Sequence, residues 1–225
     1  MGAWRTPLDL IIWDFDGTLV DSRPLIEAGM EHTLAALGLG QLPKVRETWL
    51  SCVGLPVEDG LRHTFQPLGQ DPAVVLRTYR GFDWVGHEHL LQPFPGMTEL
   101  LLELRVRKVP MAIASSKRTV PLLRQAEGLG WGGFFDPVVT PDHVRCGKPH
   151  PESLERCLAL CGLAPEQALM VGDTPFDLEM AARAGVPSLA VGHGFYGREA
   201  LEACGPRAYA PDVPALRDLL LAWTA

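Results

Sequence analysis

Short apolar runs alternate with amphipathic patterns along most of the second half of the chain. Strands are predicted from the apolar runs at 110–114, 137–140, 168–172 and 188–191. Helices are predicted from 3.6-residue apolar spacing at 97–106, 120–128, 151–161, 176–184 and 213–222. Because strands that alternate with helices pair in parallel, the pattern predicts an α/β fold, a Rossmann-like parallel sheet with helices on both faces.

One more strand is predicted near the beginning, from Leu8 to Trp13, and only Asp9 interrupts its apolar run. Such a run is typical of a strand buried on both faces. Asp14 and Asp16 follow directly, at the strand end where open α/β sheets bind their ligands. Two such acids can share a cation, or act as a nucleophile and an acid/base partner. The plainer interpretation, two solvated loop acids, fits poorly with so apolar a strand.

Between Val20 and Pro93 no apolar run reaches five residues, and only helices are predicted. They cover about 25–37, 45–52, 57–65 and 72–85. Pro93 and Pro95 then form a stiff hinge. We therefore expect a core domain made of residues 1–20 and 93–225, and an inserted α-helical cap domain made of residues 21–92, a size that a small bundle can reach.

Composition narrows the function classes. The 225 residues carry a net charge of −7 with no run of Lys and Arg, which argues against nucleic acid as a partner. No apolar run approaches the ~20 residues that span a membrane.

Five cysteines and no apparent export signal indicate a cytoplasmic protein. Cys157 and Cys161 could form half of a zinc site, but no other ligands lie nearby in the sequence, so thiols without metal are favoured. A monomer and a homodimer both remain possible.

Three further segments carry candidate chemistry. Ser115 and Ser116 follow the strand at 110–114, where a hydroxyl beside free N–H groups suits a phosphate oxygen, although a serine there is more often a helix cap. Lys148 stands in a Gly-Lys-Pro-His-Pro segment and could present its charge to a phosphate, whereas a lone lysine is usually solvated. His150 is interpreted as a capping or packing residue rather than a second base.

The last segment places two acids four residues apart behind the strand at 168–172. Asp173 directly follows Gly172, and Asp177 lies at the start of the next predicted helix. Oxygen ligands alone favour Mg²⁺ over zinc. Asp177 by itself could simply stabilise the helix start.

Taken in order, these segments resemble the four motifs of the haloacid dehalogenase-like hydrolases, in their phosphatase branch. The first motif of that family, Asp-x-Asp-Gly-Thr, corresponds to residues 14–18. The resemblance implies that Asp14 is the nucleophile that attacks a phosphoryl group and that Asp16 is the general acid/base. It also implies that Ser115, Ser116 and Lys148 bind the substrate phosphate.

The same resemblance implies a Mg²⁺ cofactor. Its ligands would be Asp14, Asp173 and the backbone carbonyl of Asp16, and Asp177 would support the metal shell or Lys148. The helical insertion resembles the family's mobile cap, whose closure excludes water. A small phosphorylated metabolite is therefore the expected substrate.

The overall pattern is most similar to phosphoglycolate phosphatases, through residues 16–22, 93–96 and 147–152 and the loop 192–197. Pyrophosphatases and sugar-phosphate phosphatases share these features and remain alternatives. Phosphoglucomutase-like relatives carry a histidine where this chain has Ile26, which weighs against a mutase. His193 could reach the substrate or could simply be exposed. A non-enzymatic regulator that binds a phosphorylated ligand is a further alternative, and the intact Asp14 and Asp16 argue against it.

Overall fold

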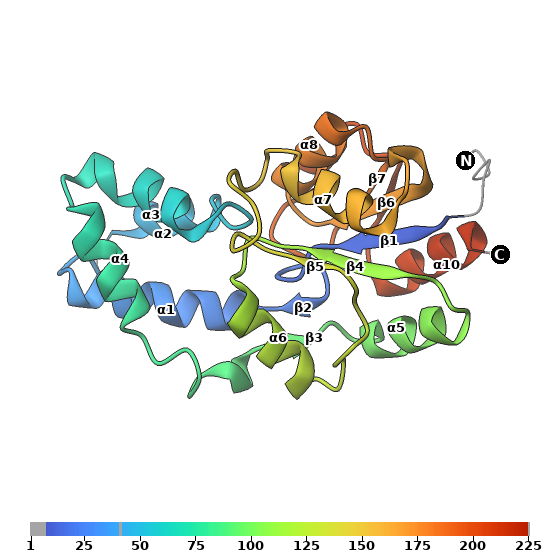
Figure 1. Ribbon diagram of the computed structural model, residues 1–225. Helices are drawn as coiled ribbons and strands as arrows, with labels where there is room; N and C mark the ends of the chain where they lie inside the picture. The colour runs from blue at the N-terminus through green and yellow to red at the C-terminus, as the bar shows by residue number, and fades with distance from the viewer. Residues whose placement is uncertain (1–7, 41, 225) are drawn as a thin grey trace.

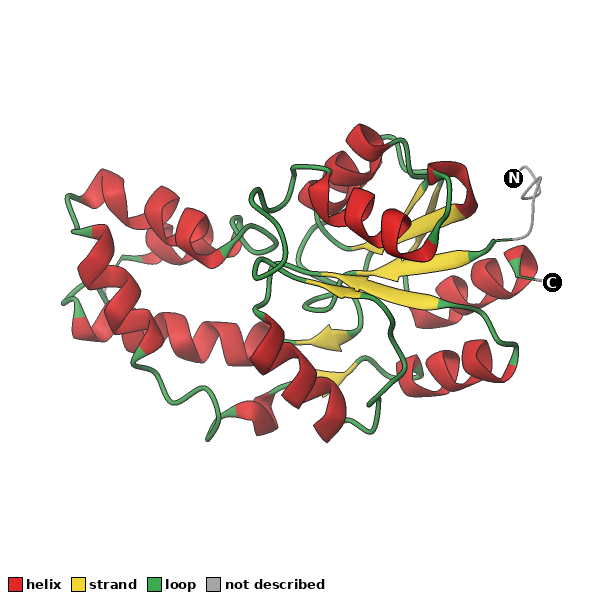
Figure 2. Ribbon diagram, in the orientation of Figure 1, coloured by secondary structure: helices red, strands yellow, loops and turns green. Residues whose placement is uncertain are grey.

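The computed structural model describes residues 8–40 and 42–224, and it contains a six-stranded parallel sheet (Figures 1 and 2). The strands are β1 (Leu10–Trp13), β4 (Met111–Ala114), β5 (Val138–Val139), β6 (Ala168–Gly172), β7 (Ser188–Val191) and β8 (Ala208–Ala210). Their order in the sheet is β5-β4-β1-β6-β7-β8. The predicted α/β class is therefore confirmed, and β1 lies in the interior of the sheet between β4 and β6.

Alternate residues of the strands build two separate cores. Leu10 and Ile12 of β1 pack with helices α7 (Glu152–Cys161) and α8 (Pro175–Ala184), whereas Ile11 and Trp13 belong to the core on the other face. That second core contains side chains of α5 (Met97–Val106), α6 (Thr119–Gly128) and α10 (Val213–Trp223). Figure 1 shows these helices below the sheet and α7 and α8 above it. Burial on both faces explains why the strand sequences are continuously apolar.

Several short elements were not predicted. Strand β8 and helix α9 (Arg198–Glu202) have three and five residues, too few for a periodic pattern. Strands β2 (Val20–Asp21) and β3 (Gln92–Pro93) form a two-stranded antiparallel ribbon on either side of the insertion. The predicted helix at 72–85 was too long, because α4 (Pro72–Arg80) ends before Gly81.

The insertion has an apolar core of its own. It consists of α1 (Arg23–Ala36), α2 (Pro43–Leu50), α3 (Val57–Phe65) and α4, with 3₁₀ turns η1 (Gln66–Leu68) and η2 (Glu88–Leu90). Its buried residues are Met30, Leu34, Val45, Trp49, Leu61, Phe65 and Val75. In Figure 1 these helices stand beyond one end of the sheet. The division into residues 21–92 and the rest stays a prediction. Among the described residues, no helix has both the length and the apolar character needed to cross a bilayer.

Candidate active site

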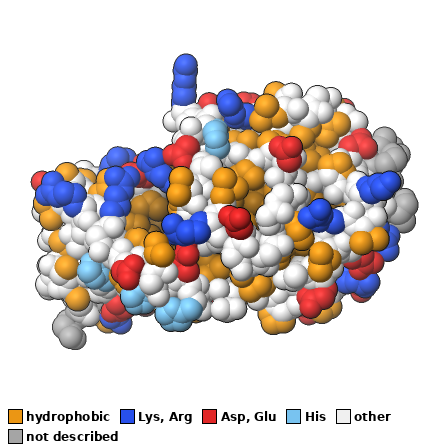
Figure 3. All heavy atoms as spheres, turned by 60° about the horizontal axis from the view of Figure 1, so that its bottom comes forward, with side chains coloured by type: hydrophobic (Ala, Val, Ile, Leu, Met, Phe, Trp, Pro, Cys, Tyr) orange, Lys and Arg blue, Asp and Glu red, His pale blue; other side chains and the backbone are white. Residues whose placement is uncertain are grey.

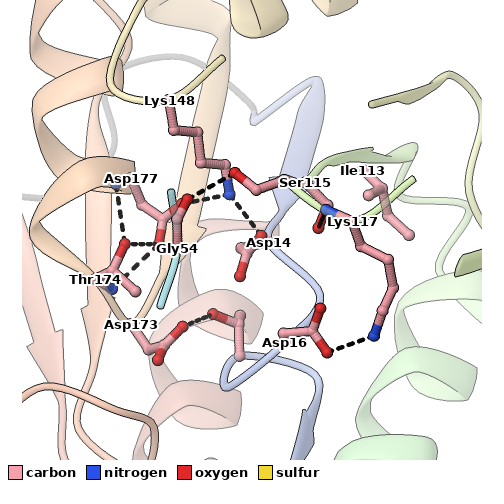
Figure 4. A network of polar contacts seen from close by, with 12 residues as sticks. Asp14, Asp16, Gly54, Ile113, Ser115, Lys117, Lys148, Asp173, Thr174 and Asp177 are labelled. Atoms are coloured by element: carbon pink, nitrogen blue, oxygen red, sulfur yellow. Dashed lines mark hydrogen bonds and ion pairs between the residues drawn. The ribbon is translucent and has the colours of Figure 1, made fainter. Parts of the chain in front are cut away.

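Three of the expected site residues follow three neighbouring strands. Asp14 comes after β1, Ser115 after β4 and Asp173 after β6. Since β1 lies between β4 and β6, their carboxyl ends bring these residues to one edge of the sheet. Figure 4 shows the three side chains around a common space, which Lys148 enters from the segment before α7. All three are at least nine-tenths buried.

Lys148 lies between two carboxylates. Its Nζ is 2.5 Å from Asp14 Oδ1 and 2.6 Å from Asp177 Oδ1, and its side chain is only 2% exposed. Burial disfavours the ammonium, but the charges of Asp14 and Asp177 outweigh it and raise the pKa of Lys148. A charged ammonium is therefore held at the carboxylate that the family resemblance implies to be the nucleophile.

Asp177 has a second task at the start of α8. Its Oδ2 accepts hydrogen bonds from the backbone N–H and the hydroxyl of Thr174, at 3.1 and 2.7 Å. The Thr174 hydroxyl also accepts from the Asp177 N–H at 3.3 Å, which completes a capping box. The cap fixes the carboxylate, so that its other oxygen points at Lys148. The two roles expected for Asp177, stabilising the start of a helix and supporting Lys148, are therefore both fulfilled by this one arrangement.

Asp173 is held by two donors from distant parts of the chain. The Thr18 hydroxyl donates to Oδ1 and the Phe195 N–H donates to Oδ2, both at 2.8 Å. The chain at Gly17 passes very close, with φ at +82°, and a Cβ there would lie 2.3 Å from Asp173 Oδ2. Only glycine fits such an approach. The first motif and the loop at 192–197 thus jointly enclose this acid.

The acids Asp14, Asp173 and Asp177 form a group that fits a cation. One carboxylate oxygen from each lies within 4.8 Å of the others. Burial raises the pKa of Asp14 to about 7, with additional repulsion from Asp177 and Asp16 that Lys148 partly offsets. Burial and the charges of Asp14 and Asp177 also raise the pKa of Asp173. A divalent cation would remove this penalty, and a set of oxygen donors suits Mg²⁺.

Asp16 points away from this group. Its Oδ1 accepts from Lys117 Nζ at 2.6 Å, and both side chains are about one-sixth exposed. The Lys117 ammonium also lies 5.2 Å from the centre of the Phe15 ring. Figure 4 shows the two aspartates turned to different sides of β1's end. Participation of the Asp16 backbone carbonyl in metal binding stays a prediction.

The two serines after β4 have different surroundings. Ser115 is 4% exposed, and its hydroxyl accepts from the Lys117 N–H at 3.3 Å. The Ser116 hydroxyl donates to the carbonyl of Gly54 in the insertion, at 2.6 Å. Ser116 therefore connects the core to the insertion in this structure. Phosphate binding by either serine stays a prediction.

A cavity of about 450 Å³ opens between the core and the insertion. Its core side includes Asp14, Asp16, Ser115 and Lys117, and its far side consists mainly of apolar residues of the insertion. The insertion also contacts the core beside it, since the Tyr196 hydroxyl donates to the Ser51 carbonyl. A substrate that presents its phosphate to Asp14 would therefore place its leaving group against the insertion.

The histidines have modest roles. The His150 Nδ1 accepts from the Glu152 N–H at 3.3 Å, as a capping residue does. The His193 Nε2 bonds the Thr18 carbonyl at 2.9 Å, and its ring packs on Phe94 with centroids 4.3 Å apart. Burial lowers the pKa of His193. His193 thus supports the first motif and the hinge and is partly buried, so of the two alternatives left open by the sequence, simple exposure does not describe it.

Cys157 and Cys161 lie outside the groups of potential metal ligands that the described residues form. Within residues 8–40 and 42–224, two groups of three potential ligands come close enough to hold a metal. One is the acidic group already described, and the other is the solvent-accessible set Cys146, His150 and Glu152. Cys157 and Cys161 belong to neither, and burial raises the pKa of both thiols.

Several residues that shape the site were not identified from the sequence. Lys117 immediately follows the two serines, so its place after β4 was a usable signal. Tyr79 and Trp84 reach the cavity from the far end of the insertion, and aromatic residues in a helical segment more often belong to a core. Ile26, which occupies the position of the mutase histidine, does line the cavity.

Comparisons with known proteins agree with this geometry. A family model described as haloacid dehalogenase-like hydrolase matches residues 11–191. A protein named pyrophosphatase PpaX from Bacillus cereus (strain AH820) is 34% identical over 202 residues, covering 88% of this chain and 90% of its own. A protein of the same name from Halalkalibacterium halodurans is 28% identical over 216 residues, covering 95% and 97%.

Solved structures extend the similarity to the whole fold. A haloacid dehalogenase-like family hydrolase from Streptococcus pneumoniae superposes with a TM-score of 0.79 at 27% identity, covering 95% of this chain and 98% of its own. A structure described as a predicted phosphoglycolate phosphatase from Haemophilus somnus has a TM-score of 0.83 at 21% identity, with 96% and 98% covered. The latter similarity concerns the fold alone.

Proposed function

The chain belongs to the haloacid dehalogenase-like hydrolase family, and on this premise we propose that it is a Mg²⁺-dependent phosphatase. The proposed reaction hydrolyses a small phosphorylated metabolite through a phosphoryl group carried by Asp14. The observation that carries the proposal is the buried contact of Asp14 with Lys148, at 2.5 Å, on the wall of a cavity large enough for a metabolite.

Each residue near this contact has a distinct task in the proposed reaction. Asp14 attacks the phosphorus in line, and Lys148 neutralises part of the charge on the transferring group. The Ser115 hydroxyl binds a phosphate oxygen at the end of β4. Asp16 protonates the leaving oxygen and then takes a proton from the water that cleaves the aspartyl-phosphate. Lys117 holds the Asp16 carboxylate on the cavity side.

Mg²⁺ fits the acidic group, and Asp14 and Asp173 are its proposed ligands together with the Asp16 backbone carbonyl. When bound, the cation would stabilise negative charge on the phosphoryl oxygens. Asp177 orients Lys148 instead of serving as a principal ligand, because both of its oxygens already have partners.

A second candidate is hydrolysis of inorganic pyrophosphate. It is favoured by the two relatives named pyrophosphatase PpaX, at 34% and 28% identity. A phosphoglycolate phosphatase, the activity expected from the sequence pattern, differs from it only in the leaving group. Since the motif residues act on any phosphoryl group, they do not discriminate between these substrates.

The proposal is tested by measuring phosphate release from 4-nitrophenyl phosphate, phosphoglycolate and pyrophosphate, each with Mg²⁺ and with excess chelator. We expect turnover of at least one substrate with Mg²⁺, and none after chelation or in Asp14→Asn. Turnover that survives exhaustive chelation would contradict the metal. Binding of these compounds without any turnover would instead favour the phospho-ligand-binding regulator.

A further inference from the structure

The part of the cavity that faces the leaving group has an aromatic wall. Tyr79 lies at its centre, with its ring centroid 4.7 Å from that of Trp84 and 5.5 Å from that of Trp49. All three residues line the cavity, together with Ile26 and Val57. Burial and the nearby charges of Asp16 and Glu58 raise the pKa of the Tyr79 hydroxyl. The wall therefore lies within electrostatic reach of Asp16 and holds no charge of its own.

Four basic residues also line the cavity, and each has an acidic partner. The pairs are Lys117 with Asp16 at 2.6 Å, Arg80 with Glu58 at 2.7 Å, Arg118 with Asp142 at 2.8 Å, and Arg124 with Glu88 at 2.6 Å. Figure 3 shows basic and acidic side chains standing close together around apolar ones on one face of the molecule. Among the described lining residues, these pairs leave no cation without an acidic partner.

A second anionic group on the substrate would meet an unfavourable environment here. It would have to displace an acid from one of these pairs, or remain beside Asp16 and Glu58 without a partner. Removing a charge from water without pairing it is costly. An uncharged flat body would instead cover the faces of Tyr79 and Trp84, and burial of apolar area stabilises that complex.

We propose that the physiological leaving group is an uncharged alcohol or phenol with an aromatic or cyclic body that packs against Tyr79 and Trp84. This inference rests on the proposed phosphatase function and narrows its substrate class. A bond forms between Asp14 and phosphorus while the ester P–O bond breaks, and Asp16 gives its proton to the leaving oxygen. Water then gives a proton to Asp16 and replaces the Asp14 oxygen on phosphorus, releasing inorganic phosphate.

The test compares two phosphate esters of nearly equal shape, 4-carbamoylphenyl phosphate and 4-carboxyphenyl phosphate. We expect kcat/KM of the wild-type protein to be at least about tenfold higher for the uncharged amide. Phosphoglycolate and pyrophosphate should also fall below the amide. Equal or higher kcat/KM for any of the three anionic leaving groups overturns the inference, and the phosphatase function still stands. Absence of turnover for all substrates with Mg²⁺ is the separate outcome that overturns the proposed function.

A charge variant tests the pairing argument directly. Glu58→Gln removes the acidic partner of Arg80, at 2.7 Å, and the longer 3.4 Å contact of Arg118, which keeps Asp142 at 2.8 Å. The amide-to-carboxylate ratio of kcat/KM should then fall severalfold. Asp59→Asn is the matched control, because Asp59 is the next residue and pairs with Arg62 at 2.9 Å. It should leave the ratio unchanged, and a ratio that Glu58→Gln also leaves unchanged contradicts the argument.

The aromatic wall is tested with Tyr79→Leu and with Tyr79→Phe, which keeps the ring. Tyr79→Leu should lower kcat/KM for phenyl phosphate by about tenfold more than for methyl phosphate, because methanol is too small to use the wall. Tyr79→Phe should retain most of the preference. Circular dichroism establishes that each variant folds. A folded Tyr79→Leu variant with an unchanged phenyl-to-methyl ratio of kcat/KM contradicts the role of the aromatic wall. If the variant does not fold, the comparison of the amide and carboxylate esters with the wild-type protein still tests the proposed leaving group.

Discussion

Lys148 Nζ lies 2.5 Å from Asp14 Oδ1 in a position from which water is almost entirely excluded. The ammonium thus neutralises the acid that is proposed to attack a dianionic phosphate. Without it, Asp14 and Asp177 would be two buried carboxylates that no other side-chain ammonium or guanidinium of the described residues contacts. The contact should therefore contribute both to catalysis and to the stability of the fold at this end of the sheet.

We predict that Lys148→Met lowers kcat/KM by a factor of about 10²–10³ on every phosphate ester, since one preorganised charge is worth that much. The variant should also lower the free energy of unfolding by roughly 3–5 kcal/mol in chelator, as removal of one partner of a buried pair does. Urea titration and steady-state kinetics measure the two effects. Lys44→Met, at an exposed site, is the control. Near-normal turnover in Lys148→Met would exclude the proposed role.

Metal and pH should act on the same acidic group. Because burial raises the pKa of Asp14 from 3.8 to about 7 in the folded protein, the folded state binds a proton more tightly than the unfolded state between these values. The free energy of unfolding of the metal-free protein should therefore decrease as pH rises from about 4 to 7, by up to about 1.4 kcal/mol per pH unit. Asp173 shifts in the same direction and adds to the effect.

Thermal unfolding at several pH values, with chelator and with Mg²⁺, measures this dependence. We expect Mg²⁺ to raise Tm near pH 7 and to do so much less near pH 4, where the acids are protonated. Asp14→Asn should weaken the pH dependence in chelator. A metal-free protein that grows more stable from pH 5 to 7 would contradict the interpretation.

The neighbouring serines should respond differently to alanine. Ser115 directly follows β4, at the same edge of the sheet as Asp14, so Ser115→Ala should lower kcat/KM on all phosphate esters by a similar factor, about tenfold. Ser116 donates its hydroxyl to Gly54 of the insertion at 2.6 Å. Ser116→Ala removes one hydrogen bond, worth about 0.5–1.5 kcal/mol, from the core–insertion contact.

We therefore expect Ser116→Ala to have a severalfold effect that depends on the size of the leaving group. Steady-state kinetics on methyl and phenyl phosphate separate the two patterns, because only the larger ester needs the insertion. If Ser116→Ala lowers kcat/KM equally on both esters and as strongly as Ser115→Ala, Ser116 binds the phosphate itself, as the family resemblance implied.

The sequence alone predicted those strands and helices whose apolar residues are buried on one or two faces. Strands 168–172 and 188–191 and helix 97–106 have the predicted bounds. In each of them the apolar pattern extends over the whole element. Strand β8 was missed since Ala208–Ala210 has only three residues, too few for an apolar run that predicts a strand. The pairing of Val20 with Pro93 depends on contacts across the insertion, which local patterns do not contain.

The candidate site divides in a similar way. Asp14, Ser115 and Asp173 each directly follow a buried strand, and the resemblance to the family's motifs grouped them into one site before the order of the strands was known. The partners of Asp16 and Ser116 could not be predicted in this manner. Lys117 turns toward Asp16 across two strand ends, and Gly54 reaches Ser116 from 62 residues away in the sequence. The first contact depends on how two neighbouring strand ends are placed in the core, and the second on how the insertion packs against the core.

Substitution of the two aspartates of the first motif should block different steps of the reaction. Asp14→Asn removes the nucleophile, so no phosphoryl-enzyme should form and turnover should disappear. Asp16→Asn keeps the nucleophile and its contact with Lys148, since Asp16 pairs with Lys117 instead. It removes the proton donor and the base that activates water. An ester with a good leaving group needs little protonation, so the first step should partly survive whereas the second should stall.

Mass spectrometry of Asp16→Asn mixed with 4-nitrophenyl phosphate and Mg²⁺ should then find a phosphoryl group on Asp14. A label on Ser115 or His150, or near-normal turnover in Asp14→Asn, would refute the assignment of the nucleophile.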